Sequence, residues 1–227
     1  MNETKRTIRV TGRGKLSVKP DTVRLIITQT EREKAYDDAV KASTKQKKAL
    51  TDAIAGQGFK REDLKTLSFD VRAEYEGYEA KDKSWKQRLV GYRYTHRMKL
   101  EFPVESGKLG SVLSALMECK GEPEFTIQYT ISDPDGAKNE LLAKAVADSR
   151  AKAEVLAGAA GVTLGEIIFV DYSWGEIDFV TTPMRDMRVT GCGERGLLMA
   201  KNEPLAPDIE PDDIDVTDTV TVVWGIE

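Results

Sequence analysis

The sequence predicts an α+β fold, with a largely antiparallel sheet and about three helices covering one face. Two observations lead to this prediction. The strand-like segments mostly alternate apolar and polar residues, which is typical of strands that have one wet face. Three longer segments instead show the 3.6-residue apolar period of helices that pack on a sheet. With 40% hydrophobic residues in a chain of 227, a core can form without a metal or a disulfide.

The first third of the chain predicts two strands, a helix and a third strand. The first two strands flank the turn signal Pro20-Asp21 and are interpreted as a hairpin. The helix covers residues 33–55 and ends at Gly56. Residues 67–73 then alternate as a strand does, and the polar residues 75–87 are expected to form a hairpin tip or loop.

The middle of the chain predicts two further strands and two further helices. Residues 92–102 form the longest alternating segment and predict a strand with one buried face. A helix is expected at about 106–119, and a strand at 125–131 follows it. Asp133 as N-cap, with a proline after it, marks the start of a long alanine-rich helix that ends at Ala160.

The last third predicts a strand at 167–174 and a closing strand at 214–227 that returns to the sheet. Between them, residues 175–211 are rich in proline and glycine and are expected to be a long loop or insertion. We expect a single domain over residues 1–227.

Composition excludes several classes of protein. No apolar run approaches the roughly 18 residues of a membrane span, so we expect no integral membrane segment. The net charge of −4 argues against nucleic acid as a partner. A single histidine excludes a multi-histidine metal site, and we expect no cofactor. Residues 1–10 contain no apolar signal segment, so cytoplasm is expected, or the periplasm or another extracytoplasmic compartment if a signal peptide was removed.

A series of short motifs resembles the SIMPL-domain family, which includes YggE-like proteins and periplasmic immunogenic proteins. The motifs are Ile8-x-Val10-x-Gly12-x-Gly14, Val18-x-Pro20-Asp21, Gly58-Phe59, Gly91-Tyr92-Arg93, Leu164-Gly165 and Ile209-x-Pro211. This resemblance implies an α+β fold and, for some members, ring-like or channel-like homo-oligomers. It also implies a link to oxidative-stress tolerance in bacterial members and a kinase partner for a mammalian one. It implies no catalytic residues.

Two segments on or beside predicted strands contain candidate functional residues. Gly12-Arg13-Gly14 has glycines, but a phosphate-binding turn needs them before a helix. Because another strand follows, a bulge or turn is favoured. His96, the single imidazole, shares a strand face with Tyr94 and Met98. No nucleophile and acid accompany it in sequence, so a core or edge histidine with its hydrogen bonds satisfied is favoured.

The two cysteines have different contexts. Cys192 lies in Gly-Cys-Gly-Glu-Arg, where Arg195 would lower the thiol pKa and favour a redox-sensing role. The alternative is an incidental loop cysteine. Cys119 ends a predicted helix and is expected to be buried. We expect two free thiols, with one bridge as the alternative in an oxidising compartment.

Charge clusters give the remaining candidates. The acidic run between Asp208 and Asp218 and the segment Asp133-Pro134-Asp135-Gly136 both lack EF-hand spacing. A solvated turn is favoured for the first and a helix cap for the second. The basic stretch consists of Lys41, Lys45, Lys47 and Lys48. It has no interleaved aromatic residues, which favours a solvated helix face.

The sequence therefore predicts a non-enzymatic protein that self-associates and contacts other proteins, with a link to oxidative-stress tolerance implied by the resemblance. Homo-oligomerisation through exposed strand edges is the preferred hypothesis. A redox-responsive protein that uses Cys192 and a small-molecule-binding module are the alternatives.

Overall fold

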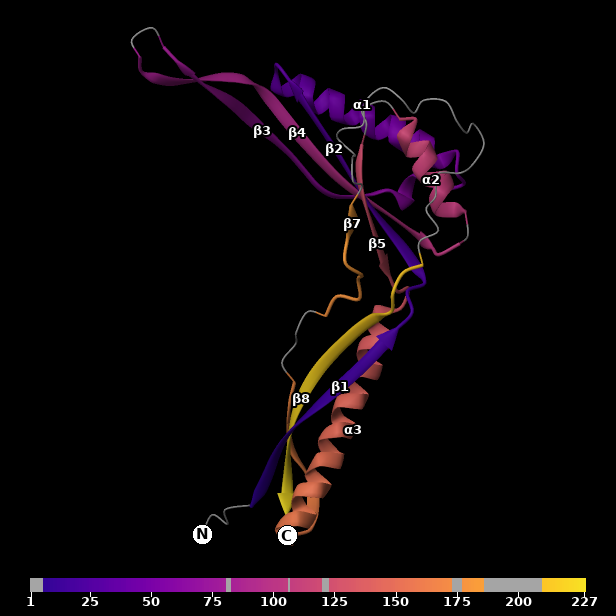
Figure 1. Cartoon of the computed structure of the whole chain (residues 1–227), viewed down its shortest axis with the longest axis vertical. Helices are drawn as coiled ribbons and strands as arrows, with labels where there is room; N and C mark the ends of the chain where they lie inside the picture. The colour runs from indigo at the N-terminus through magenta and orange to yellow at the C-terminus, as the bar shows by residue number, and fades with distance from the viewer. Residues whose placement is uncertain (1–5, 81–82, 106, 120–122, 173–176, 186–209) are drawn as a thin grey trace, which may run out of the picture. The chain divides into compact units, whose positions relative to one another are not determined.

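The structure, a computed structural model, describes residues 6–80, 83–105, 107–119, 123–172, 177–185 and 210–227. Three helices and two antiparallel sheets make up this part of the chain, so the predicted α+β class is confirmed (Figure 1). The chain divides into two compact units. Unit 1 comprises residues 1–20, 130–181 and 211–227, and unit 2 comprises residues 21–129 and 182–210. The single domain over residues 1–227 stays a prediction.

Unit 1 contains a three-stranded sheet in which the first and last strands of the chain lie side by side (Figure 1). Strand β1 (Thr7–Val18) pairs with β8 (Ile214–Ile226) along its whole length without a register shift. Strand β8 also pairs with β6 (Leu164–Asp171), so the order is β1-β8-β6. Alternation along β1 and β8 buries one set of side chains in the unit's core: Val10, Leu16, Ile214, Val220, Val222 and Trp224.

Helix α3 (Pro134–Ala160) packs against this sheet. Its start is capped by Asp133, whose carboxylate accepts a hydrogen bond from the N–H of Gly136 at 2.8 Å. Its end is Gly161, at a φ of 69° that favours glycine. Both predicted helix ends are confirmed. The buried face of the helix consists mainly of small residues: Leu141, Ala145, Ser149, Ala153 and Ala157.

Unit 2 contains a five-stranded sheet in the order β3-β4-β2-β5-β7 (Figure 1). The strands are β3 (Lys65–Glu79), β4 (Trp85–Pro103), β2 (Thr22–Glu33), β5 (Glu124–Thr130) and β7 (Met184–Arg185). The helices are α1 (Tyr36–Ala55) and α2 (Lys108–Met117), with a short 3-10 turn, η1 (Arg61–Asp63), after α1. Large apolar side chains from both helices and from the strands form one core, which includes Leu25, Ile27, Leu50, Ile54, Met98, Leu100, Phe102, Val112 and Leu116.

The predicted hairpin of the first two strands is wrong. Strand β1 pairs with β8, and β2 pairs with β4. Alternation shows which face of a strand is buried but not which strand lies beside it. The turn at Pro20-Asp21 therefore connects strands of different sheets.

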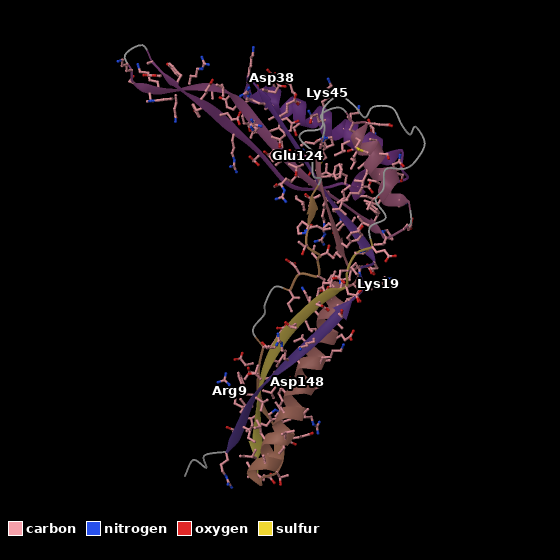
Figure 2. The ribbon with its side chains drawn as sticks, in the orientation of Figure 1. Arg9, Lys19, Asp38, Lys45, Glu124 and Asp148 are labelled. Carbon is pink, nitrogen blue, oxygen red and sulfur yellow. The ribbon has the colours of Figure 1, made fainter. Side chains whose placement is uncertain are left out.

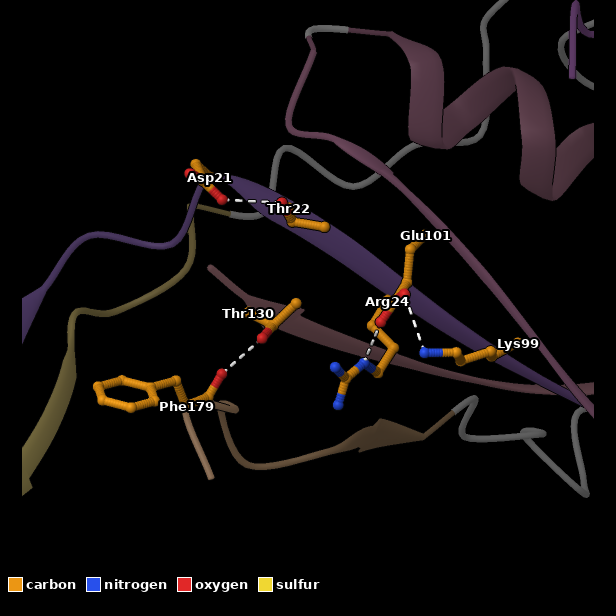
Figure 3. Close-up of polar contacts among 7 residues, drawn as sticks. All are labelled: Asp21, Thr22, Arg24, Lys99, Glu101, Thr130 and Phe179. Atoms are coloured by element: carbon orange, nitrogen blue, oxygen red, sulfur yellow. Dashed lines mark hydrogen bonds and ion pairs between the residues drawn. The ribbon is translucent and has the colours of Figure 1, made fainter. Parts of the chain in front are cut away.

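The predicted loop at 175–211 is only partly within the described residues. Residues 177–185 of it are described, and they hold strand β7, which pairs with β5. The same stretch contains a bridge between Val180 and Thr130 and the buried side chain of Phe179. The hydroxyl of Thr130 donates to the carbonyl oxygen of Phe179 at 2.6 Å (Figure 3). Residues 177–185 are therefore held against neighbouring strands, and the long loop or insertion over residues 175–211 stays a prediction.

Candidate functional site

The candidate redox thiol, Cys192, lies outside the described residues, as does Arg195 beside it. Cys119 is described, half-buried just after α2, where its thiol donates to the carbonyl of Ala115 at 3.4 Å. Burial, and then the charge of Glu118, raise the pKa of this thiol. A raised pKa reduces the thiolate fraction at neutral pH, so Cys119 has the character of a structural cysteine.

The glycines at 12 and 14 serve packing rather than phosphate binding. The bulge or turn that the sequence favoured is wrong, since β1 runs through both glycines without a register shift. A Cβ atom added at Gly12 would overlap the Ala145 carbonyl oxygen and would lie 2.6 Å from the Cβ of Ser149. One added at Gly14 would overlap the carbonyl of Leu141. Glycine is therefore needed because the backbone of α3 approaches β1 this closely.

A side-chain contact also holds α3 close to β1. The carboxylate of Asp148, labelled on α3 in Figure 2, accepts a hydrogen bond from the backbone N–H of Arg13 at 2.6 Å. It also pairs with Lys152 one turn further along the helix, at 2.7 Å. Hydrogen bonds from these two groups lower the pKa of Asp148, so the carboxylate is ionised at neutral pH.

His96 is buried in unit 2, with 6% of its surface exposed. Its Nδ1 lies 3.2 Å from the hydroxyl of Ser43 on α1, and its Nε2 lies 3.0 Å from the hydroxyl of Thr66 on β3. The ring also makes an edge contact with Phe69, at 5.2 Å between centroids. Burial first, and then the charge of Lys47, lower the pKa of the imidazole. His96 is thus a neutral core histidine with both ring nitrogens hydrogen-bonded, in agreement with the favoured interpretation.

Further buried polar groups lie beside His96 on the face of the sheet that α1 covers. Gln29 is opposite His96 in the register, and Tyr94 is two residues from it along β4. Both are fully buried, and the Gln29 side-chain amide has no hydrogen-bond partner among the described residues. Burial first, and then the nearby carboxylate of Glu31, raise the pKa of the Tyr94 hydroxyl. A buried polar group without a partner costs stability. The unpaired Gln29 amide therefore lowers the stability of the unit 2 core.

The solvated turn favoured for the acidic run is wrong for two of its described residues, since Asp215 and Asp218 lie on strand β8. The basic stretch is, as favoured, mostly a solvated helix face. Of the basic stretch, Lys41, Lys45 and Lys48 are exposed on α1, and Figure 2 labels Lys45 there. Lys47 is half-buried and donates to the hydroxyl of Thr66 at 3.3 Å. Across the described ranges, no group of three or more acidic, histidine or cysteine side chains is placed to hold a metal. Asp208 lies outside these ranges.

The feature that sequence reasoning missed is an arm at the ends of β3 and β4. Of the two alternatives for residues 75–87, the hairpin tip is confirmed, but most of these residues are strand, since β3 continues to Glu79 and β4 begins at Trp85. Strand β2 ends at Glu33, opposite Tyr92. Beyond that point β3 and β4 continue as a two-stranded ribbon (Figure 1). We call residues 75–79 and 85–90 the β3–β4 arm.

One face of this arm is apolar and exposed. Directly opposed residues in an antiparallel pair share a face, and Tyr75 is opposed to Leu89, Gly77 to Gln87, and Glu79 to Trp85. The exposed fractions are 61% for Tyr75, 47% for Leu89 and 77% for Trp85. The Trp85 ring lies beside Gly77, 3.8 Å from where a Cβ would be. This alternation of Tyr75, Gly77 and then Trp85, Leu89 was present in the sequence, where the polar residues between them obscured it.

The other face of the arm is charged. Arg88 pairs with Glu76 at 3.0 Å and lies 5.8 Å above the centre of the Tyr78 ring. Acidic residues lie on β3 and basic residues on β4. Glu76 faces Lys86 and Arg88 on this side, while Glu79, opposed to Trp85, lies at the edge of the apolar face. The arm therefore has an apolar face and two strands of opposite charge.

Comparisons with known proteins identify the family of this chain. The family model SIMPL, described as a protein of unknown function (DUF541), matches residues 8–224. A 26 kDa periplasmic immunogenic protein of Brucella abortus is 25% identical over 200 residues, which cover 88% of this chain and 77% of the relative. The protein of the same name from Brucella melitensis is 24% identical over 200 residues, with the same coverage. No helix within the described ranges is long and apolar enough to cross a membrane. The match over residues 8–224 establishes that the chain belongs to the SIMPL family.

Proposed function

We propose that this protein is a non-enzymatic interaction module that associates with a second copy of itself through the β3–β4 arm. The observation that carries the proposal is the exposed apolar face of the arm, formed by Tyr75, Leu89 and Trp85. Contiguous exposed apolar side chains mark interaction surfaces. Burying one large apolar side chain contributes about 1.5–3 kcal/mol, so two such faces in contact would stabilise a dimer or a larger assembly.

Two further properties of the arm favour a copy of the same chain as the occupant. A two-stranded ribbon is only marginally stable alone in water, so the arm gains stability from a surface that covers it. The acidic β3 side of one arm can lie against the basic β4 side of another, because each arm carries both charges. A second copy supplies apolar area and complementary charge together.

The non-enzymatic part of the proposal is supported by the placement of His96. The imidazole is buried, and both ring nitrogens bind internal hydroxyl groups. An acid–base catalyst needs a ring nitrogen within reach of the substrate.

We also propose that the native protein acts in the periplasm, because the relatives from both Brucella species are named periplasmic proteins. Fractionation of cells that express the natural gene, followed by blotting, tests this location. Recovery in the cytoplasmic fraction alone would contradict it.

Sedimentation velocity tests the self-association. We expect the wild-type protein to show species heavier than 25.2 kDa whose fraction grows with concentration. Because Tyr75 and Leu89 are exposed, the variant Tyr75→Ser/Leu89→Ser should fold normally and lose the heavier species. A wild-type protein that sediments as a monomer at every concentration would overturn the proposal.

The redox role of Cys192 and the link to oxidative-stress tolerance stay predictions. If Cys192 is a redox sensor, its alkylation rate should show a lowered pKa, and Cys192→Ala should lose the stress phenotype. A slow thiol with full function in Cys192→Ala would end that hypothesis.

A further inference from the structure

Three arginines lie in a row across the face of the unit 2 sheet that points away from α1. Arg32 on β2 is opposed to Arg93 on β4, and Arg93 is opposed to Arg72 on β3. Directly opposed like charges destabilise a sheet. Strands are about 4.8 Å apart, so the row spans about 10 Å.

Only two carboxylates compensate these arginines within the described residues. Glu74 accepts a hydrogen bond from Nε of Arg93 and lies 3.7 Å from Arg32. Asp70 lies 3.1 Å from Arg72. Arg97 is on the same face of β4, two pleats from Arg93, and makes no ion pair with any described residue. Three guanidinium groups therefore share two carboxylates, and the fourth has none among the described residues.

The excess of positive charge continues along the same face. Glu101 accepts from Arg24 at 2.6 Å and from Lys99 at 2.9 Å, as Figure 3 shows. Here again two cations share one carboxylate. The net charge of the whole chain is −4, so the charge of this face is opposite in sign to the net charge.

The arginine row also lines a depression in the surface. A groove of about 450 Å³ is lined by Arg72, Arg93, Glu74, Asp70 and Thr95, among others. A second groove of about 480 Å³ shares Arg93 and Glu74 with it and adds Arg32. The exposed fractions of the three arginine side chains are 54% for Arg32, 45% for Arg93 and 82% for Arg72. The guanidinium groups are thus accessible within a concave surface.

We propose that this row, Arg32–Arg93–Arg72, binds a phosphate-rich anion that carries two or more linked phosphate groups. Guanidinium groups bind phosphate oxygens in a bidentate manner, and neighbouring arginines at strand spacing match a chain of linked phosphates. Glu74 is the internal counter-ion that such a ligand displaces. Its carboxylate is ionised, because the hydrogen bond from Arg93 lowers its pKa, so it competes with the ligand for the same donors.

Calorimetric titration with inorganic tripolyphosphate tests the proposal. We expect saturable binding by the wild type, weakened at least tenfold in Arg93→Gln. Arg72→Gln, at the most exposed position, provides a second variant with the same expectation should Arg93→Gln fail to fold. Glu74→Gln should bind more tightly, because the internal competitor is gone. Sodium sulfate at equal ionic strength should bind more weakly, because it offers a single oxyanion.

Two controls separate this site from other effects. Arg150→Gln removes an exposed arginine of α3 that pairs with Glu154 and should leave the affinity unchanged. Trp85→Ser alters the arm alone. If this variant binds tripolyphosphate with the affinity of the wild type, binding does not depend on self-association. A parallel titration with ATP distinguishes a nucleotide from a free polyphosphate, since added contacts to the base would tighten binding. Absence of tripolyphosphate binding to the wild type, or equal losses in Arg93→Gln and Arg150→Gln, would overturn the proposal.

Discussion

In both units a helix packs on a sheet, but the side chains at the two contacts differ in size. In unit 1, α3 lies on its sheet through small residues, with Ala145 and Ser149 against Gly12. In unit 2, α1 lies on its sheet through large ones, with Leu50 and Ile54 in the same core as Leu25. The contact between α3 and β1 leaves no space for an added atom. The contact between α1 and its sheet depends instead on large side chains that fill the core. We therefore expect the two units to respond in opposite ways to changes in side-chain volume.

The largest expected effect is that of Gly12→Ala in unit 1. The added methyl group would overlap the backbone of α3 at Ala145 and Ser149. Because the helix must move away from β1, we expect a loss of at least about 3 kcal/mol in the free energy of unfolding. Urea denaturation measures this loss.

Gly158→Ala is the matched control. It makes the same substitution within α3 at a site where an added Cβ meets nothing within 4 Å. Alanine is the better helix former, so a gain of up to about 1 kcal/mol is expected. Equal stability of Gly12→Ala and the wild type would contradict the close approach of α3 to β1.

The second effect is a cavity in unit 2. Leu50 is fully buried between α1 and the sheet, so Leu50→Ala should reduce the free energy of unfolding by about 2–5 kcal/mol. Urea denaturation again gives the value. The control Val155→Ala changes a residue of α3 that is 71% exposed and should alter stability by no more than about 0.5 kcal/mol. A loss for Leu50→Ala no larger than that of the control would show that α1 does not cover the core.

The smallest effect concerns pH and the buried His96 of unit 2. The pKa of His96 is lowered in the folded protein by burial and by Lys47, so the unfolded chain binds its proton more readily. The stabilising contribution is therefore complete above the unfolded pKa of about 6.5 and is lost as the pH falls through that value toward the folded pKa. One proton limits the slope to about 1.4 kcal/mol per pH unit.

Because the chain has one histidine, the difference between wild type and His96→Gln isolates this effect. Unfolding free energies measured from pH 7.5 to pH 5 should fall more steeply for the wild type. Parallel curves for the two proteins would contradict the burial of a neutral imidazole at this position.

The same comparison shows what sequence could and could not predict. Alternation identified the buried face of β4, with Tyr94, His96 and Met98, because a strand's own residues determine which ones share a face. Asp133 and Gly161 marked the ends of α3 for the same local reason. The requirement for glycine at position 12 could not be predicted, because it depends on a helix more than 100 residues away. Strand partners and the arginine row also arise only when distant strands pair.

The arm is different, because its pattern was local. Tyr75 and Gly77, and Trp85 and Leu89, alternate as strand residues do, but the polar residues between them favoured a short hairpin tip or a loop. A ribbon with one charged face has the composition of a loop and the periodicity of a strand. Giving periodicity more weight than composition would have revealed it.

The most direct test of the proposed self-association is the mass of the particle in solution. Light scattering on wild type, Trp85→Ser and Val155→Ser over a dilution series compares two exposed apolar residues, one on the arm and one on α3. We predict masses above 25.2 kDa for the wild type and Val155→Ser, and the monomer mass for Trp85→Ser. A monomer mass for all three proteins, or unchanged assembly in Trp85→Ser, would contradict association through the arm.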